Sequence, residues 1–257
     1  MSFVTIPFSC VRDGLTILGF AYEPSERTLR YPVVMCHGLG GTMEEPLPYA
    51  AYLAERGVCS YLFDFIGGSY DTSSDGDYEH DMTPIAQVED LRCVLDLVAT
   101  REQEKPVILG CSQGGLVCGL AAGWGAAIRA LALIYPAFSI PDDARAGHFI
   151  NFVFDPHDIP DALSDGTQTI SGDYMRSIID LDAIAEAAAY TGDVFIAHGT
   201  ADALIPFAYA ERAKAAFDAA GASCELHPIV GAPHYYREGP ALDETCVLLE
   251  AWLRTLS

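Results

Sequence analysis

Short runs of wholly apolar residues alternate with longer stretches of helical character along most of this chain. The apolar runs cover residues 32–37, 58–65, 106–111, 130–136, 193–199 and 224–230. The helical stretches cover residues 48–57, 84–102, 113–125, 206–221 and 240–256. Strands that are apolar throughout are buried on both faces, and the helices that separate them form the covering layers. The alternation therefore predicts an α/β fold in which helices cover both faces of a parallel sheet.

Two further strand-like runs open the chain, at residues 3–10 and 15–22, and they flank the pair Asp13-Gly14. Such a pair between strand-like runs indicates a β-hairpin. Together with the later runs, the hairpin brings the expected sheet to eight strands, most of them parallel.

The length of 257 residues and the hydrophobic content of 51% are enough for one large core. We therefore expect a single domain over residues 1–257. Residues 137–190 interrupt the alternation, because they are rich in Asp, Pro, Gly and aromatic residues and lack a long regular period. We interpret them as an insertion that forms a cap over one edge of the sheet.

The charge balance argues against several classes of partner. The chain has 36 acidic and 14 basic residues, a net charge of −22, and no cluster of Lys or Arg. Nucleic acid and anionic membrane surfaces are therefore not expected as partners. The first residues lack the pattern of a signal peptide, and no apolar run reaches the length of a membrane span. A cytoplasmic protein is the expectation.

The eight cysteines do not form a pattern typical of disulfides or metal sites. No C-x-x-C pair occurs, and Cys36, Cys59 and Cys111 lie inside apolar runs, which is typical of reduced, buried thiols. No group of His, Cys and carboxylates has the spacing of metal ligands, so no metal or other cofactor is expected. The sequence leaves the oligomeric state open, a homodimer included.

One serine stands in a pattern that can make it a nucleophile. The pentad Gly110-Cys111-Ser112-Gln113-Gly114 lies between an apolar run and a helical stretch. In a nucleophile elbow, G-x-S-x-G forms a strained strand–turn–helix that exposes the serine at a helix N-terminus. The alternative is an ordinary glycine-rich turn. The strand–turn–helix setting favours Ser112 as the nucleophile.

A serine nucleophile needs a base and a carboxylate, which follow the elbow in the order Asp or Glu, then His. His234 lies in GAPHYY, after the last apolar run and before the last helical stretch, whereas His198 and His227 lie inside apolar runs. Asp202 lies in HGTADALIP, directly after the run at 193–199. The alternatives are a plain loop histidine and a helix-capping aspartate. We predict His234 as the base and Asp202 as the group that orients it.

The negative charge that develops on an attacked carbonyl needs two backbone donors. The N–H of Gln113, next after the nucleophile, is one candidate. The loop CHGLGGT at residues 36–42 follows another apolar run, and its glycines allow a close approach to a substrate oxygen. The N–H of Leu39 is the second candidate.

Five short motifs together resemble those of the α/β-hydrolase superfamily over nearly the whole chain, and within it those of the small bacterial feruloyl (cinnamoyl) esterases. The motifs are HG-x-x-G, FDF…G, G-x-SQGG, HG-x-x-D and GA-x-H. Three stretches in and beside the expected insertion add to this resemblance: PAFSIPDDARAG (136–147), DPHDIPD (155–161) and SGDYMRSIIDLD (171–182). The resemblance implies a cap in which Asp143 and Tyr174 contact the phenolic hydroxyl of the acyl group. Ile150 stands where some relatives have a Gln.

The function that this resemblance implies is a serine carboxylesterase that hydrolyses hydroxycinnamate esters through an acyl-enzyme. A generic short-acyl esterase, a lipase-like hydrolase and an acylaminopeptidase-like hydrolase are alternatives on the same scaffold, because specificity depends on the cap. A non-catalytic binding protein with the same fold is a further alternative. The expected partner is a small-molecule ester.

Overall fold

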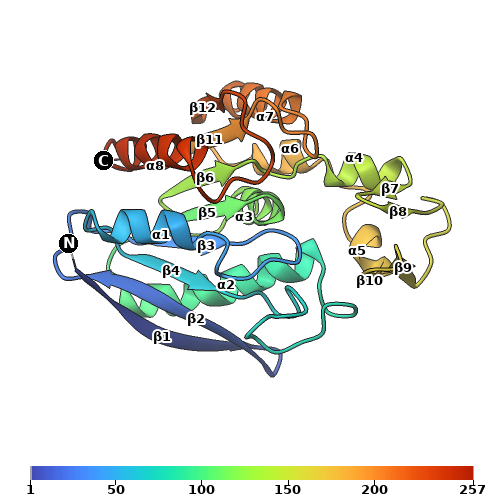
Figure 1. Ribbon diagram of the computed structural model, residues 1–257, viewed down its shortest axis with the longest axis horizontal. Helices are drawn as coiled ribbons and strands as arrows, with labels where there is room; N and C mark the ends of the chain where they lie inside the picture. The colour runs from blue at the N-terminus through green and yellow to red at the C-terminus, as the bar shows by residue number, and fades with distance from the viewer. Residues whose placement is uncertain (1, 257) are drawn as a thin grey trace.

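The computed structural model describes residues 2–256. Its main sheet has eight strands in the order β1-β2-β4-β3-β5-β6-β11-β12 (Figure 1). The strands are β1 (Phe3–Arg12), β2 (Leu15–Pro24), β3 (Val33–Cys36), β4 (Ser60–Phe63), β5 (Val107–Cys111), β6 (Ala130–Ile134), β11 (Asp193–Gly199) and β12 (Ser223–Ile229). Strand β2 pairs antiparallel with β1 and with β4, and the other pairings are parallel. The predicted hairpin and mostly parallel eight-stranded sheet are confirmed.

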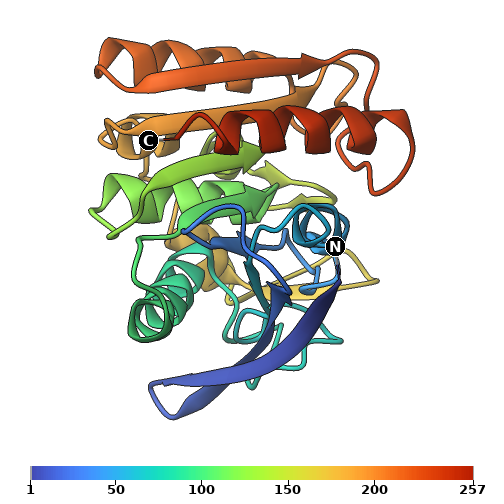
Figure 2. The ribbon, with the colours of Figure 1, turned by 90° about the vertical axis from the view of Figure 1, so that its left-hand side faces the viewer.

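Helices cover both faces of this sheet (Figure 2). They are α1 (Leu47–Ala54), α2 (Pro84–Arg101), α3 (Gln113–Gly123), α7 (Ala208–Ala219) and α8 (Pro240–Leu253). One hydrophobic core lies between the sheet and α2, α3 and α7, and a second lies between the sheet and α1 and α8. The sheet is therefore the middle of three layers, as predicted.

Strand β3 shows why its sequence is apolar at every position. Val34 and Cys36 belong to the core under α2, α3 and α7, whereas Val33 and Met35 belong to the core under α1 and α8. All four side chains are completely buried. Successive side chains of a strand point to opposite faces, so a strand covered on both faces needs apolar residues throughout.

The segment over residues 137–190 is built differently from the rest of the chain. It contains α4 (Ile140–Arg145), β7 (His148–Phe149), β8 (Phe152–Val153), β9 (Ala162–Ser164), β10 (Thr169–Ser171), α5 (Gly172–Arg176) and α6 (Ala183–Ala187). The four short strands form two antiparallel pairs outside the main sheet. The elements from α4 to α5 lie beyond one end of the sheet, whereas α6 packs against α3 (Figure 1). We call residues 137–190 the inserted segment; its role as a cap stays a prediction.

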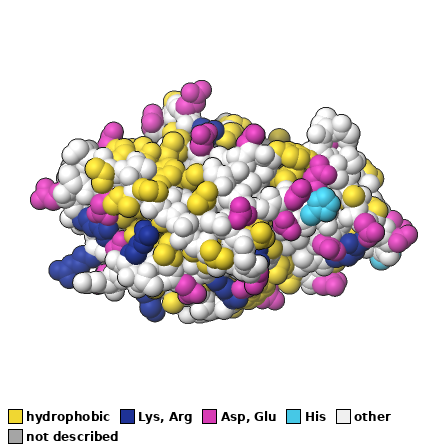
Figure 3. All heavy atoms as spheres, turned by 90° about the horizontal axis from the view of Figure 1, so that it is seen from below, with side chains coloured by type: hydrophobic (Ala, Val, Ile, Leu, Met, Phe, Trp, Pro, Cys, Tyr) yellow, Lys and Arg dark blue, Asp and Glu magenta, His cyan; other side chains and the backbone are white. Residues whose placement is uncertain are grey.

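All eight cysteines are free thiols, and Cys36, Cys59 and Cys111 are fully buried, as expected of reduced thiols that pack as small hydrophobic groups. Among the described helices, none is both long enough and apolar enough to cross a bilayer. On the face shown in Figure 3, acidic side chains are spread from end to end, while most Lys and Arg side chains lie toward the end opposite the inserted segment.

Candidate active site

Strand β5 and helix α3 meet in a sharp turn at Ser112, whose backbone has φ 52° and ψ −118°. A positive φ is uncommon and strained for a residue with a side chain. The turn is possible because its neighbours are small: a Cβ on Gly110 would overlap the carbonyl of Gly114, and a Cβ on Gly114 would lie 2.5 Å from the His37 carbonyl oxygen. The turn thus has the geometry of the predicted nucleophile elbow.

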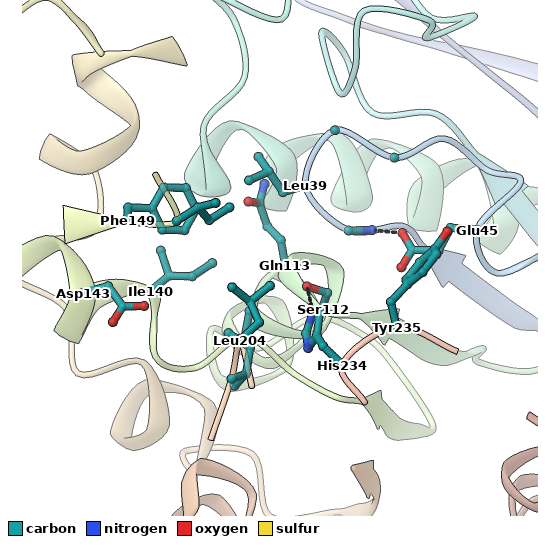
Figure 4. A pocket seen from close by; sticks show the side chains of 16 residues that line it. Leu39, Glu45, Ser112, Gln113, Ile140, Asp143, Phe149, Leu204, His234 and Tyr235 are labelled. Carbon is teal, nitrogen blue, oxygen red and sulfur yellow. Dashed lines mark hydrogen bonds between the residues drawn. The ribbon is translucent and has the colours of Figure 1, made fainter. Parts of the chain in front are cut away.

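The structure brings together the three residues that were predicted as a triad. Ser112 Oγ lies 2.9 Å from His234 Nε2 (Figure 4). His234 Nδ1 lies 2.7 Å from Asp202 Oδ2. His234 stands in the loop between β12 and α8, and Asp202 in the loop that follows β11. An ionised carboxylate only accepts hydrogen bonds, so the Asp202 contact places the imidazole proton on Nδ1 and leaves Nε2 to accept from the serine hydroxyl.

The Asp202 carboxylate is fully occupied by donors. Its Oδ1 accepts from the backbone N–H groups of Leu204 and Ile205, at 2.9 and 2.8 Å. Its Oδ2 lies 2.9 Å from His198 Nε2, in addition to the contact with His234. Burial alone would raise the pKa of Asp202, but the hydrogen bonds from His198, His234 and Ile205 outweigh burial and hold the pKa well below its ordinary value. The carboxylate therefore stays ionised beside the imidazole.

His198 is a site residue whose role the sequence reasoning missed. Its side chain is completely buried on β11, and its Nε2 lies 2.9 Å from Asp202 Oδ2 and 3.0 Å from the Ile205 carbonyl oxygen. A histidine in an apolar run was interpreted as structural, and no pattern showed which way its ring points. The HG-x-x-D spacing, which places His198 four residues before Asp202, was the available signal.

The two predicted oxyanion donors line the same cavity as Ser112. Gln113 is the first residue of α3, and the first N–H groups of a helix have no partner within the helix. Within residues 2–256, no hydrogen bond engages the backbone N–H of Gln113 or of Leu39. Both donors are thus available to an oxygen beside Ser112.

Two buried side chains fix the loop that carries Leu39. His37 Nδ1 lies 2.8 Å from the Gly38 carbonyl oxygen, and its Nε2 accepts from the Phe65 N–H at 3.2 Å. Burial lowers the pKa of His37, so the neutral ring makes both contacts. The Gly38 N–H donates to Glu45 Oε2 at 2.5 Å. The loop is therefore held at its first residues, His37 and Gly38.

Glu45 is a buried carboxylate that the sequence reasoning did not select. Burial raises the pKa of Glu45 to about 7, although the hydrogen bond from Gly38 and the charge of Arg237 lower it. This pKa lies above the ordinary value of 4.5. The folded chain therefore keeps a proton that the unfolded chain releases, and the free energy of unfolding falls as pH rises from 4.5 to about 7.

We expect Glu45→Gln to remove this part of the pH dependence, because a glutamine has no proton to release. The difference in unfolding free energy between variant and wild type should change by up to about 3 kcal/mol across the window. Urea unfolding at several pH values from 4.5 to 7 measures the effect. The exposed neighbour Glu44, changed to Gln, serves as control. The same pH slope in Glu45→Gln and wild type would contradict the raised pKa.

A cavity of about 320 Å³ opens beside Ser112. The inserted segment lines one end with apolar side chains and one carboxylate, whereas the opposite end carries Glu45 and Tyr235 (Figure 4). The residues contributed by the inserted segment are Ala137, Ile140, Asp143, Phe149 and Ile150. Ile150 has φ 53° and is 43% exposed, so this β-branched residue is held in a strained turn where it lines the cavity.

The structure brings Asp143, but not Tyr174, to the cavity lining. Asp143 Oδ2 accepts from the Ser139 hydroxyl at 3.0 Å, and burial raises the pKa of Asp143. Tyr174 is completely buried behind Phe149, with their rings stacked 5.1 Å apart. Its hydroxyl donates to Gln113 Oε1 at 2.5 Å. The Tyr174 hydroxyl therefore faces the elbow helix rather than the cavity.

Gln113 links the inserted segment to the main sheet. Its Oε1 accepts from Tyr174, and its Nε2 donates to Gln87 Oε1 on α2 at 2.8 Å. Gln113 and Tyr174 have no exposed surface, and Gln87 is only 1% exposed. Buried polar groups are costly unless they are paired. This chain of hydrogen bonds therefore fixes the first residue of α3 beside Ser112.

Within residues 2–256, three groups with metal-ligand atoms lie close together: Glu23, Cys59 and Glu102. The Arg27 guanidinium donates to both carboxylates, at 2.7 Å to Glu23 and 2.6 Å to Glu102. A cation of the chain itself therefore already pairs with both carboxylates of this group, in which Glu23 lies on β2, Cys59 directly precedes β4 and Glu102 directly follows α2.

Comparisons with known proteins agree with this architecture. A model of the alpha/beta hydrolase fold matches residues 31–150. The structure of Est1E from Butyrivibrio proteoclasticus with ferulic acid bound superposes with a TM-score of 0.87 at 26% identity, over 97% of this chain and 98% of that one. A second Est1E structure gives a TM-score of 0.83 at 25% identity, with the same coverage.

The monoacylglycerol lipase of Paleococcus ferrophilus shares the fold, with a TM-score of 0.71 at 20% identity over the whole of both chains. A sequence search of the curated proteins found no match. The order of the strands, the elbow at Ser112 and the similarity to these solved structures all indicate the same fold. The chain has the α/β-hydrolase fold, and these findings support its place in the α/β-hydrolase superfamily.

Proposed function

We propose that this chain is a serine carboxylesterase that hydrolyses hydroxycinnamate esters through an acyl-enzyme. The observation that carries the proposal is the chain of hydrogen bonds from Ser112 through His234 to Asp202, beside a cavity with two free backbone donors. This is the arrangement that nucleophilic acyl transfer requires. The oxyanion donors are the N–H groups of Leu39 and Gln113.

Each half of the reaction uses His234 twice. Ser112 Oγ attacks the ester carbonyl as its proton passes to His234 Nε2, and the carbonyl oxygen becomes an oxyanion at the two N–H groups. The tetrahedral intermediate collapses, the C–O bond to the alcohol breaks, and His234 returns the proton to the leaving oxygen. His234 then removes a proton from water, which attacks the carbonyl carbon of the acyl-enzyme. When the second tetrahedral intermediate collapses, the carboxylic acid is released and His234 returns the proton to Ser112 Oγ.

The inserted segment is proposed as the cap of a single domain over residues 1–257 and as the acyl-binding part. A hydroxycinnamoyl group is flat and apolar along its length, with a polar hydroxyl at its far end. Ile140, Phe149 and Ile150 offer apolar walls, and Asp143 offers an acceptor in the same cavity. Est1E, whose structure contains bound ferulic acid, superposes on 97% of this chain, which supports this class of substrate.

We expect Asp143→Ala to lower kcat/KM for methyl ferulate by roughly 3- to 10-fold, the effect of one net hydrogen bond. Methyl cinnamate, which lacks the phenolic hydroxyl, should be nearly unaffected. Steady-state kinetics on the two esters provide the measurement. Equal losses on both would mean that Asp143 shapes the cap without contacting the hydroxyl.

Tyr174→Phe is the informative comparison for the second predicted cap residue. The hydroxyl is buried on Gln113, so its loss should slow both esters alike. It should also lower the free energy of unfolding by about 1–3 kcal/mol, because Gln113 Oε1 loses its donor. A loss confined to the ferulate ester would instead place the Tyr174 hydroxyl against the substrate.

A panel of esters separates this proposal from its alternatives. Turnover of p-nitrophenyl acetate that disappears in Ser112→Ala distinguishes an enzyme from a binding protein. Methyl ferulate, caffeate and p-coumarate are then compared with methyl butyrate. Higher kcat/KM for the hydroxycinnamates supports the proposed substrate class, and higher kcat/KM for butyrate assigns a short-acyl esterase.

A further inference from the structure

The cavity continues past Ser112 on the side away from the inserted segment. In Figure 4, Ser112 and His234 lie between Asp143 and Phe149 on one side and Glu45 and Tyr235 on the other. If the acyl group occupies the side of Asp143, the alcohol of the ester extends toward Glu45. This placement agrees with the chemistry, because His234 must deliver its proton to the leaving oxygen.

Glu45 is a carboxylate with one oxygen occupied and one free. Only 6% of the residue is exposed, yet it lines the cavity. Its Oε2 accepts from the Gly38 N–H at 2.5 Å, whereas its Oε1 has no hydrogen-bond partner among the residues that the structure describes. Oε1 is not among the described side-chain atoms that are sealed in the interior without a partner, so it opens onto the cavity. It is therefore available to a hydrogen-bond donor on a ligand in the cavity.

The surrounding glycines keep the carboxylate close to the nucleophile. A Cβ on Gly38 would lie 3.1 Å from Ser112 Cβ and 3.2 Å from Glu45 Oε2, and a Cβ on Gly41 would lie 2.9 Å from the same oxygen. A side chain at Gly38 would therefore fill the space between Ser112 and Glu45, and one at Gly41 would press on the carboxylate itself. Gly38 leaves the space between nucleophile and carboxylate open.

We infer that Glu45 determines specificity in a leaving-group subsite that accepts alcohols carrying a further hydroxyl group. This inference rests on the proposed esterase function and adds the alcohol half of the substrate. A hydroxyl two or more carbons from the ester oxygen pairs with the free Oε1, as a donor to the ionised carboxylate or as an acceptor from its protonated form, and Tyr235 also lines the subsite. The subsite therefore favours a diol or polyol ester over an alkyl ester of the same size.

The charges around Glu45 favour a neutral donor over a cationic one. Arg237 donates to the Glu44 carbonyl oxygen at 2.5 Å, and its guanidinium lies 6.0 Å from the centre of the Tyr235 ring. Its positive charge acts on the Glu45 carboxyl. A substrate ammonium or phosphate would be attracted by one of these two charges and repelled by the other, whereas a neutral hydroxyl needs only the free oxygen of Glu45.

The test compares 2-hydroxyethyl and propyl ferulate, which have the same acyl group and alcohols of the same number of heavy atoms. The quantity measured is the ratio of kcat/KM for the two esters. We expect Glu45→Leu to lower this ratio roughly 3- to 10-fold relative to wild type, as expected for one lost hydrogen bond. The difference in intrinsic reactivity between the esters cancels in this comparison. Glu44→Gln, the exposed neighbour, should leave the ratio unchanged.

A second measurement uses the wild-type protein alone, so it does not depend on the folding of the variant. The acyl-enzyme formed from methyl ferulate is partitioned between water and an added alcohol. A subsite for hydroxylated alcohols should make ethylene glycol a better acyl acceptor than propanol at equal concentration, by more than the twofold that its two hydroxyl groups give statistically. An advantage of twofold or less, or better capture by propanol, would overturn the inference.

The remaining outcomes separate the inference from the proposed function. If Glu45→Leu slows both esters equally, the carboxylate only holds Gly38 and its loop, and the subsite is wrong. If wild type prefers the choline ester over the 3,3-dimethylbutyl ester and Glu45→Gln loses that preference, the subsite is cationic and the hydroxyl assignment fails. If wild type hydrolyses none of the esters, the esterase proposal itself fails, and the subsite with it.

Discussion

Replacing Ser112 by alanine is expected to lower kcat for ester hydrolysis by about 10⁴-fold or more. Members of a triad act as a unit, so the loss of the nucleophile removes nearly all of the covalent pathway. The variant should fold, because alanine and serine place a Cβ on the same strained backbone with φ 52°. The missing hydroxyl removes one hydrogen bond, from Oγ to His234. We expect His234→Ala to cause a loss of similar size.

The release of p-nitrophenol from its acetate ester measures this effect, and the burst phase shows whether an acyl-enzyme forms. Ser164, an exposed serine on β9, provides a matched Ser→Ala control that should keep full activity. Urea unfolding of Ser112→Ala checks that the fold is intact. Near-native turnover by folded Ser112→Ala would mean that another group is the nucleophile.

The main sheet could be predicted because burial on both faces leaves a strong sequence signal. Every side chain of β3, β4 and β5 is buried, which produces short apolar runs that polar helices and turns separate. The edge hairpin is more exposed, yet the pair Asp13-Gly14 identifies its turn. Both residues have positive φ there, at 53° and 86°, a conformation that Asp and Gly adopt more readily than most residues.

The inserted segment could be predicted only as an interruption. Its strands have two or three residues and its helices five or six. A helix this short does not complete the two or three turns over which a helical period of apolar residues can be recognised. A strand this short does not show the alternation of apolar and polar residues that identifies a strand. The direction of a side chain inside such a segment is therefore not readable, which is why the inward orientation of Tyr174 could not be foreseen.

The positions of the candidate triad followed from chain order and sheet topology. Loops that follow parallel strands meet at the same edge of a sheet, so Ser112 after β5, Asp202 after β11 and His234 after β12 converge there. The supporting residues were harder to find. Glu44 and Glu45 are adjacent and chemically identical in the sequence, but only Glu45 is buried against Gly38, and no period in this loop distinguishes them.

Asp202→Asn is expected to cost about 10⁴-fold in kcat, as the equivalent change does in a triad on an unrelated fold. The structure gives a local reason for the size of the effect. The backbone N–H groups of Leu204 and Ile205 both donate to Oδ1, so the asparagine must place its carbonyl oxygen there. Its NH₂ group then takes the place of Oδ2, opposite His234 Nδ1.

An NH₂ group donates where the carboxylate oxygen accepted, so His234 must turn to the tautomer with its proton on Nε2. Nε2–H then faces the Ser112 hydroxyl as a donor and cannot remove its proton. Steady-state kinetics of Asp202→Asn measure the loss, and Asp193→Asn, at the opposite end of β11, is the control that should retain activity. If Asp202→Asn were fully active while Asp193→Asn was impaired, Asp202 would not be the residue that orients His234.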